Sequence, residues 1–132
     1  MARHCRTGSA RKVAQIAKAQ DIPTKFLEAI LTQLKSAQIV TSTRGASGGY
    51  FLKDLPVEVT VANVIYAVQG PLDIVTQVTK SGQNISPADN VLAAVFGQID
   101  VLVDQVFSGL TLQELIDRQD ELHDNQVASY TI

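Results

Sequence analysis

The sequence predicts a mainly α-helical protein with one small β-hairpin and one long helix in its C-terminal half. Three patterns support this fold class. Apolar residues recur at helical spacing between residues 13 and 36, two strand-like runs flank a glycine-rich loop at 44–50, and a second helical pattern extends from residue 86 to about residue 108. With 132 residues, 45% of them apolar, the chain can form one packed domain and an oligomerisation arm.

Charge divides the chain into two parts. Residues 1–53 contain nine Lys and Arg against two acids, a net charge of +7, whereas residues 54–132 contain two Lys and Arg against eleven acids, a net charge of −9. This division favours a basic half that faces a polyanion and an acidic half that faces solvent or a partner. No apolar run approaches the roughly 18 residues of a membrane span, no secretory signal is visible, and the single Cys5 fits a reducing cytoplasm.

The first 36 residues predict two helices joined by a tight turn. Residues 1–12 are polar and basic without periodicity, so we expect a flexible basic arm. A short helix is predicted for residues 11–18, and Asp21 tolerates the left-handed conformation that a tight turn requires. A second helix is expected to begin near Pro23 and to end at about Ser36. This order predicts a helix-turn-helix.

The second helix has one apolar and one polar face. The apolar stripe consists of Phe26, Leu27, Ile30, Leu31 and Leu34, and the polar face of Thr24, Lys25, Glu28, Thr32 and Lys35. In a helix-turn-helix that reads DNA, Lys25 could reach phosphate or guanine and Glu28 could accept from the amino group of cytosine. For the helix alone, a merely solvated polar face is the simpler alternative.

A β-hairpin is predicted directly after these helices. The runs 39–43 and 50–52 are rich in β-branched and aromatic residues, and a loop with three glycines joins them. Glycine permits positive φ and the close approach of another molecule to the backbone. The loop carries Arg44 and no acid, which suits a DNA phosphate backbone or a narrow minor groove. Two helices followed by such a hairpin have the order of a winged helix-turn-helix.

Residues 13–71 resemble the Rrf-two (Rrf2) family of bacterial winged-helix transcription regulators, which includes the iron–sulfur cluster regulator and the cysteine-metabolism repressor. The resemblance is carried by Ile16-Ala17, Gln20-Asp21-Ile22, Phe26-Leu27-Glu28, Leu34-Lys35, Ile39-Val40, Arg44-Gly45-Ala46-Ser47-Gly48-Gly49-Tyr50 and Gly70-Pro71-Leu72. It implies that Thr24, Lys25 and Glu28 read bases and that Arg44 enters the minor groove. The expected DNA-binding residues are Thr24, Lys25, Glu28, Arg44, Gly45, Ser47, Gly48, Gly49 and Tyr50.

The chain departs from the family pattern in two ways. Cluster-sensing members carry three cysteines before their long helix, but this chain has none there, and His4 with Cys5 gives too few ligands for a metal site. We therefore expect no cofactor and no metal. Family members also begin with an additional helix of about 15 to 20 residues, whereas only twelve residues precede Val13. Either the start codon is wrong, the gene is truncated, or this version manages without that helix.

Without the additional helix, part of the apolar face formed by Ile16, Leu27 and Leu31 is expected to be exposed. The isolated chain is then expected to have low stability or to aggregate. Residues 13–72 would still form the winged helix-turn-helix domain. A short helix is predicted from its cap at Thr60 to Gln69, where Gly70-Pro71 ends it.

The C-terminal half predicts a dimerisation helix. After a connecting loop at 73–85, Ser86-Pro87 opens a helix of about 33 Å that ends near Ser108, in the dimerisation region 86–132. Its apolar stripe predicts an isologous dimer, which the resemblance also implies. The expected dimerisation residues are Leu92, Val95, Phe96, Ile99, Leu102, Val103 and Val106. The alternative is that this helix packs on its own domain. A capping box at Thr111–Glu114 opens a last helix, expected to fold back on the long one.

Two classes of function follow. The first is a homodimeric, sequence-specific DNA-binding repressor of transcription in the cytoplasm, without an iron–sulfur cluster. The second is a winged-helix interaction module that has lost DNA binding, for example a partner of a cysteine biosynthetic enzyme, as in the cysteine-repressor branch of the family. An enzyme is disfavoured because no Ser/His/Asp set, phosphate loop or paired carboxylate beside a histidine is visible.

Overall fold

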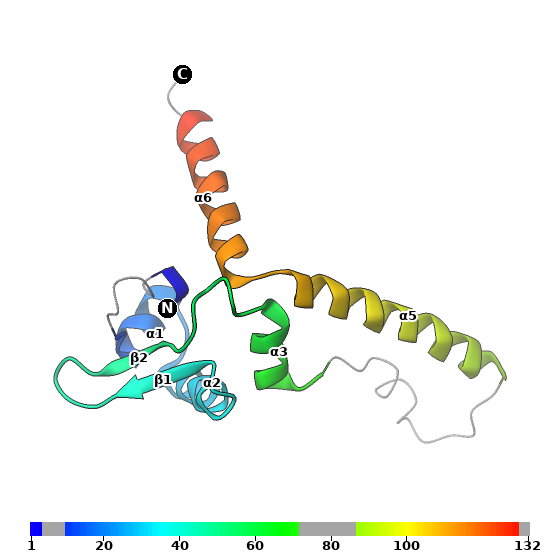
Figure 1. The fold of residues 1–132 in the computed structure, drawn as a ribbon, viewed down its shortest axis with the longest axis horizontal. Coiled ribbons are helices and arrows are strands. Elements are labelled where there is room, and N and C mark those ends of the chain that lie inside the picture. Colours follow the sequence, from blue (N-terminus) through cyan, green and yellow to red (C-terminus); the bar gives the residue numbers. More distant parts are fainter. Residues whose placement is uncertain (4–9, 72–86, 130–132) are drawn as a thin grey trace.

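The described chain forms five helices and a two-stranded antiparallel hairpin, so the predicted mainly α-helical fold class is confirmed. The structure, a computed structural model, describes residues 1–3, 10–71 and 87–129. The first helices, the hairpin and α3 gather at one end, and α5 and α6 extend from it in two different directions (Figure 1). The elements are α1 (Val13–Gln20), α2 (Thr24–Ser36), β1 (Val40–Thr43), β2 (Gly49–Leu52), α3 (Val61–Gln69), α5 (Pro87–Gly109) and α6 (Leu112–Ser129).

The turn between α1 and α2 is the one that the sequence predicts. Asp21 ends α1 in the left-handed conformation, with φ 51° and ψ 45°, and its backbone N–H donates to the carbonyl of Ala17. Pro23 precedes the first residue of α2, where its fixed φ suits a helix start. The helix predicted from residue 11 begins two residues later, at Val13. Local side-chain chemistry therefore sets this helix-turn-helix.

The hairpin packs its alternate residues into the protein. Val40 pairs with Leu52 and Ser42 with Tyr50, and both Val40 and Leu52 are buried. Arg11 extends this sheet through a bridge to Tyr50, in which the two backbone N–H groups donate to the opposite carbonyls at 2.8 and 2.9 Å. The flexible arm predicted for residues 1–12 is therefore wrong at its described C-terminal end.

The N-terminal end of that arm also contacts the domain. Met1 packs against both of the buried clusters that form the core, and so does Tyr50. One cluster is Ala17, Leu27 and Leu31, and the other is Leu34, Ile39, Val40, Leu52 and Val59. Of the face expected to be partly exposed, Leu27 and Leu31 are buried, at 6% and 1% exposed, and Ile16 is partly buried. Phe26, predicted in the apolar stripe, is instead 62% exposed, because its position is about 100° from Leu27 around the helix.

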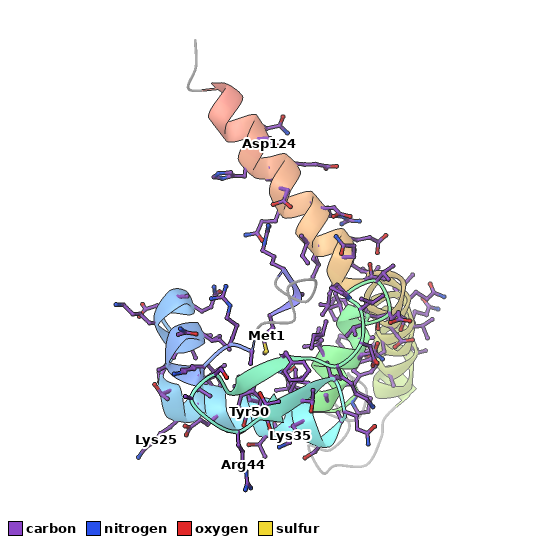
Figure 2. All side chains as sticks on the ribbon, turned by 60° about the vertical axis from the view of Figure 1, so that its left-hand side comes forward. Met1, Lys25, Lys35, Arg44, Tyr50 and Asp124 are labelled. Atoms are coloured by element: carbon purple, nitrogen blue, oxygen red, sulfur yellow. The ribbon has the colours of Figure 1, made fainter. Side chains whose placement is uncertain are left out.

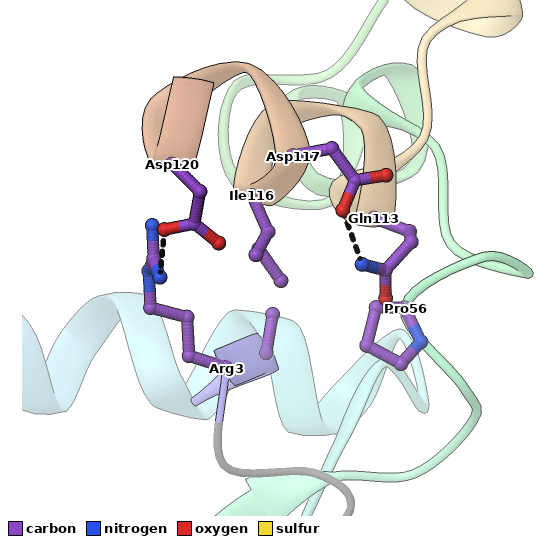
Figure 3. A pocket seen from close by; sticks show the side chains of 7 residues that line it. Arg3, Pro56, Gln113, Ile116, Asp117 and Asp120 are labelled. Carbon is purple, nitrogen blue, oxygen red and sulfur yellow. Dashed lines mark hydrogen bonds and ion pairs between the residues drawn. The ribbon is translucent and has the colours of Figure 1, made fainter. Parts of the chain in front are cut away.

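The first three residues also join the core to α6. The Arg3 guanidinium forms an ion pair with Asp120 at 2.7 Å and donates to the Gln119 side chain at 2.8 Å. Ala2 and Arg3 line a cavity of about 350 Å³ beside α6 (Figure 3). Pro56 and Gln113 also line this cavity. Gln113 in turn donates to Asp117 at 2.8 Å.

We expect the Arg3–Asp120 pair to contribute little to stability. Its side chains are 41% and 56% exposed, and ion pairs in water are worth about 0–1 kcal/mol. Arg3→Ala should therefore lower the free energy of unfolding by less than about 1 kcal/mol in urea denaturation. A double-mutant cycle with Asp120→Ala, repeated at high salt, isolates the pair. A loss of several kcal/mol would show that the contact between residues 1–3 and α6 supports the core instead.

Capping fixes α3 as predicted, and α3 in turn holds α5. The Thr60 hydroxyl accepts from the backbone N–H of Asn63 at 3.2 Å, and Gly70 ends the helix with φ 80°. The Tyr66 hydroxyl donates to the Asp104 carboxylate on α5, and this hydrogen bond raises the pKa of the Tyr66 phenol. The side of α5 that carries Asp104 therefore faces the winged domain.

The helix α5 is long and apolar. Its 23 residues span about 34 Å at 1.5 Å per residue. The stretch Val91–Gly109 has a mean hydropathy of 1.5 and, by length and composition only, could cross a membrane. A count of uninterrupted apolar residues misses this stretch because polar residues such as Gln98 interrupt it. Length and composition alone do not show that α5 spans a membrane, and the helix of a soluble protein can meet the same criterion.

The helix α6 begins as predicted but takes another direction. The Glu114 carboxylate accepts from the backbone N–H of Thr111 at 2.8 Å, and the N–H of Glu114 donates to the Thr111 hydroxyl at 3.2 Å, which is the predicted capping box. Instead of folding back on α5, however, α6 diverges from it (Figure 1). Backbone bonds from Leu112 to Val59 and from Gln113 to Pro56, at 2.9 and 3.1 Å, hold its first turn against the loop before α3.

The capping box should give α6 a pH-dependent stability. Hydrogen bonds from the Thr111 backbone and then from its hydroxyl lower the pKa of Glu114 below its ordinary value of 4.5. A carboxyl group whose pKa is lowered in the folded state stabilises that state at pH values above its ordinary pKa. This stabilisation is lost as the pH falls through the lowered pKa. We expect Glu114→Gln, which keeps the capping geometry, to remove that component. Urea unfolding midpoints of the parent and of Glu114→Gln, measured from neutral pH to about pH 3, give this pH-dependent part of the stability. The same dependence of the midpoint on pH in both proteins would contradict the prediction.

Several sequence predictions lie outside the described residues. These are the positions of His4 and Cys5, the connecting loop at 73–85, and the Ser86 cap. The remaining predictions for the C-terminal half fall on α5 and α6.

Candidate nucleic-acid interface

The exposed side of α2 carries the predicted base-reading residues. Thr24, Lys25 and Glu28 are all exposed, because Leu27, Leu31 and Leu34 bury the opposite side of the helix. The Thr32 hydroxyl donates to the carbonyl of Glu28 at 2.8 Å, so it is satisfied within the helix. The face that remains available therefore combines one cation, one carboxylate and one hydroxyl.

A side chain also links the wing to α2. The Lys35 ammonium donates to the Ser42 hydroxyl at 2.7 Å and so joins the last turn of α2 to β1. At the tip, Gly45 has φ 109°, and the N–H of Gly48 donates to its carbonyl at 3.0 Å. Arg44 and Ser47 are exposed on this turn.

The last two glycines of the wing are required by contacts inside the chain. A Cβ at Gly48 would lie 2.4 Å from the carbonyl oxygen of Thr43, and a Cβ at Gly49 would lie 2.5 Å from the carbonyl oxygen of Arg11. The sequence suggests that these glycines leave room for an outside molecule, but the close approaches seen are to the backbone of the protein itself. Tyr50, also predicted to bind DNA, packs against both core clusters.

The structure brings the cations of α2 and the wing to one side of the domain. Figure 2 shows Lys25, Lys35 and Arg44 along the same margin, whereas Asp124 on α6 lies at the far end of the molecule. Within the described part of the chain, Lys25 and Arg44 form no salt bridge. The resulting surface, which we call the basic face, is defined by Lys25, Lys35 and Arg44.

The predicted dimerisation stripe lies on the free side of α5. Phe96 and Val103 are partly buried, and the other members are exposed. The exposed members are Leu92, Val95, Ile99, Leu102 and Val106, with exposed fractions between 38% and 62%. An apolar stripe of this size on one long helix is unusual for a monomer surface.

Comparison with known proteins identifies the family. A family model described as Rrf2, iron-dependent transcriptional regulator, matches residues 1–118. The chain belongs to the Rrf2 family. An HTH-type transcriptional regulator of Mycobacterium tuberculosis is 31% identical over 109 residues, which cover 83% of this chain and 68% of that protein. The Rrf2-like regulator of Rhodobacter capsulatus is 31% identical over 115 residues, which cover 79% and 73% of the two chains.

Solved structures agree with this assignment. IscR of T. potens superposes with a TM-score of 0.73 at 25% identity, covering 92% of this chain and 78% of that one. CymR, the global cysteine regulator of B. subtilis, superposes with a TM-score of 0.67 at 23% identity, covering 84% and 81%. The protein is thus a transcriptional regulator of the Rrf2 family with a winged helix-turn-helix, and its relatives are regulators rather than enzymes.

Proposed function

We propose that this Rrf2-family protein is a homodimeric repressor that binds a specific operator with its basic face. The observation that carries the proposal is that Lys25 on α2 and Arg44 on the wing project from the same side of the domain. A recognition helix in the major groove and a wing arginine in the adjacent minor groove would use both at once. A dimer bound over a promoter would exclude RNA polymerase.

Glu28 should determine sequence preference rather than affinity. It is exposed on α2 beside the proposed base-reading residues Thr24 and Lys25, and its carboxylate can accept from the amino group of cytosine. Glu28→Ala should lose discrimination of about 1–3 kcal/mol at one base pair and change overall affinity less. Selection of bound sequences from a random pool measures this. An unchanged preferred sequence would contradict the assignment of Glu28.

An iron–sulfur cluster does not fit the ligands that this chain supplies. The family description is iron-dependent, but the whole sequence contains one cysteine and two histidines. Cysteine-ligated clusters need several thiolates. In the described ranges, no three His, Cys, Asp or Glu side chains lie together as a metal site requires. We therefore propose a regulator controlled by something other than a bound cluster.

A second copy of the chain is the proposed partner of α5. Two carboxylates, Asp100 and Asp104, lie in the middle of its apolar stretch, and Asp104 accepts from Tyr66 of α3. If α5 crossed a bilayer, these carboxylates would lie near its centre, where a charge is costly. A partner helix, in contrast, needs to cover only the apolar stripe and can leave both carboxylates uncovered. We propose that the protein is cytoplasmic and that an isologous dimer places two basic faces on a palindromic operator.

A protein-interaction module remains the second candidate. The observation in its favour is α6, which diverges from α5 and exposes acids along its length, with Asp117, Asp120 and Asp124 among them. Such a surface suits a basic protein partner better than DNA. This candidate includes an association with a cysteine biosynthetic enzyme. It predicts no sequence-specific affinity for DNA.

One titration separates the two candidates. The purified chain is titrated against fluorescent DNA from its own upstream region and a scrambled duplex, at two salt concentrations. Saturable binding that prefers the native fragment and weakens with salt would support the DNA-binding repressor, because phosphate contacts release counterions. Weak and equal binding to both duplexes would overturn it in favour of the interaction module. A reporter gene under the native promoter then tests repression.

A further inference from the structure

A cavity on the outer face of the hairpin is separate from the predicted base-reading residues. It has a volume of about 540 Å³ and lies between the start of α1 and the wing. Lys12, Gln15, Thr43, Ser47 and Phe51 line it. None of the predicted functions uses Lys12 or Phe51, since the sequence places Lys12 in a flexible arm and Phe51 in a strand.

Backbone pairing explains why these residues meet. Phe51 pairs with Thr41 and therefore points to the opposite face of the hairpin from its neighbour Tyr50, which packs into the core. The bridge between Arg11 and Tyr50 places Lys12 beside Gly49, on the same outer face as Phe51. The cavity thus depends on the short third strand that Arg11 forms.

The chemistry of the cavity suits an anion with an apolar part. Lys12 supplies a cation, and Thr43 and Ser47 supply hydroxyl donors. The Gln15 oxygen accepts from the backbone N–H of Lys12 at 3.3 Å, which leaves its amide N–H groups as further donors. The lining contains no acid, whereas two other polar cavities in the described chain include carboxylates, Asp117 and Asp120 in one and Asp54 and Glu58 in the other.

We propose that this cavity holds the sugar–phosphate backbone of the DNA strand beside the groove that the wing enters. Thr43 directly precedes Arg44 in the chain and Ser47 lies three residues after it, so a phosphate here would neighbour the groove that receives Arg44. Phosphate oxygens accept from Lys12 and the hydroxyls, and the deoxyribose packs against the Phe51 ring. Phe51 favours this ligand over a free phosphate ion, which has no apolar part to bury. The inference rests on the proposed DNA-binding function.

The test compares Lys12→Gln with the parent in DNA binding as a function of salt. The Lys12 side chain is exposed, and the bonds that cap α1 come from its backbone, so the variant should fold. Because each copy of the dimer loses one phosphate contact, the plot of log Kobs against log salt should become shallower by about 2, with affinity about 10- to 100-fold weaker at 0.1 M salt for native and scrambled duplexes alike. Circular dichroism confirms folding.

Lys53→Gln is the matched control. It removes the same charge from the same basic half, but its ammonium donates to Gln38 at 2.8 Å, outside the cavity. Its salt slope should equal that of the parent. A neutral methylphosphonate can replace the phosphates of the duplex one at a time. At the phosphate that Lys12 contacts, this replacement should lower the DNA affinity of the parent but not that of Lys12→Gln.

The outcomes separate this inference from the proposed function. A parent chain that shows no salt-dependent DNA binding would overturn both. A parent that binds its operator while Lys12→Gln keeps the same salt slope would overturn the cavity assignment alone. The third outcome is a thermal midpoint that rises with inorganic phosphate in the parent but not in Lys12→Gln, while the two proteins bind DNA with equal affinity. This result would show a site for small anions and would also overturn the cavity assignment.

Discussion

Replacing Arg44 by alanine should weaken operator binding by about 10- to 100-fold while the dimer stays intact, if the wing arginine enters the minor groove. A charged donor in a narrow groove is worth about 1–3 kcal/mol, and Arg44 is exposed on a turn whose backbone is held by the bond from Gly48 to Gly45. The side chain can therefore be removed without disturbing the hairpin. Fluorescence anisotropy with the native upstream duplex measures the affinity, and sedimentation measures the dimer.

Arg118→Ala provides the matched control for Arg44→Ala. It makes the same chemical change at an exposed arginine on α6, the helix that extends away from the basic face (Figure 2). Its operator affinity should equal that of the parent at moderate salt. Equal affinity of Arg44→Ala and the parent for a specific operator would show that the wing assignment is wrong, whatever the result for Glu28.

The parts of the fold that the sequence predicts well are those with a local cause. Asp21 in the left-handed turn, the Thr60 cap and the Thr111–Glu114 capping box each depend on residues within three or four positions. The side-chain chemistry of such motifs is sufficient to place them. Local motifs alone do not predict the order of the helices and strands, and this order is predicted from the family resemblance.

The parts that fail depend on contacts between distant residues. The bridge from Arg11 to Tyr50 involves a single residue of an apparently irregular segment, and no periodicity can indicate it. The packing of Met1 against the core and the direction of α6 likewise depend on tertiary contacts. These contacts attach the described ends of the predicted arm, residues 1–3 and 10–12, to the domain. Leu31, which belongs to the face expected to be partly exposed, is buried.

In the candidate site, neighbouring residues of one sequence motif have different structural roles. The run from Arg44 to Tyr50 is one motif in the sequence, but the structure divides it by role. Arg44 and Ser47 are exposed, Gly48 and Gly49 fit close approaches inside the chain, and Tyr50 joins the two core clusters. A motif that combines folding and binding requirements therefore overstates the number of residues available to contact DNA.

The largest expected effect on assembly comes from Val106→Glu, which should weaken the proposed dimer by at least about 100-fold. Val106 is 62% exposed and belongs to the apolar stripe of α5. In an isologous interface the substitution buries a carboxylate from each copy, and an unpaired buried charge costs several kcal/mol. Sedimentation equilibrium over a range of protein concentrations measures the dissociation constant, and operator affinity should fall with it because a monomer contacts only one half-site.

Val101→Glu makes this prediction sharply testable. Val101 is 56% exposed on the same helix, and the chemical change is identical, but five residues of helix separate the two positions by about 140° around the axis. If α5 pairs through the stripe, Val101→Glu should leave the dimer unchanged. Dissociation by Val101→Glu but not by Val106→Glu would place the interface on the other side of α5. A parent chain that is monomeric at every concentration and partitions into lipid vesicles would instead make Val91–Gly109 a membrane segment.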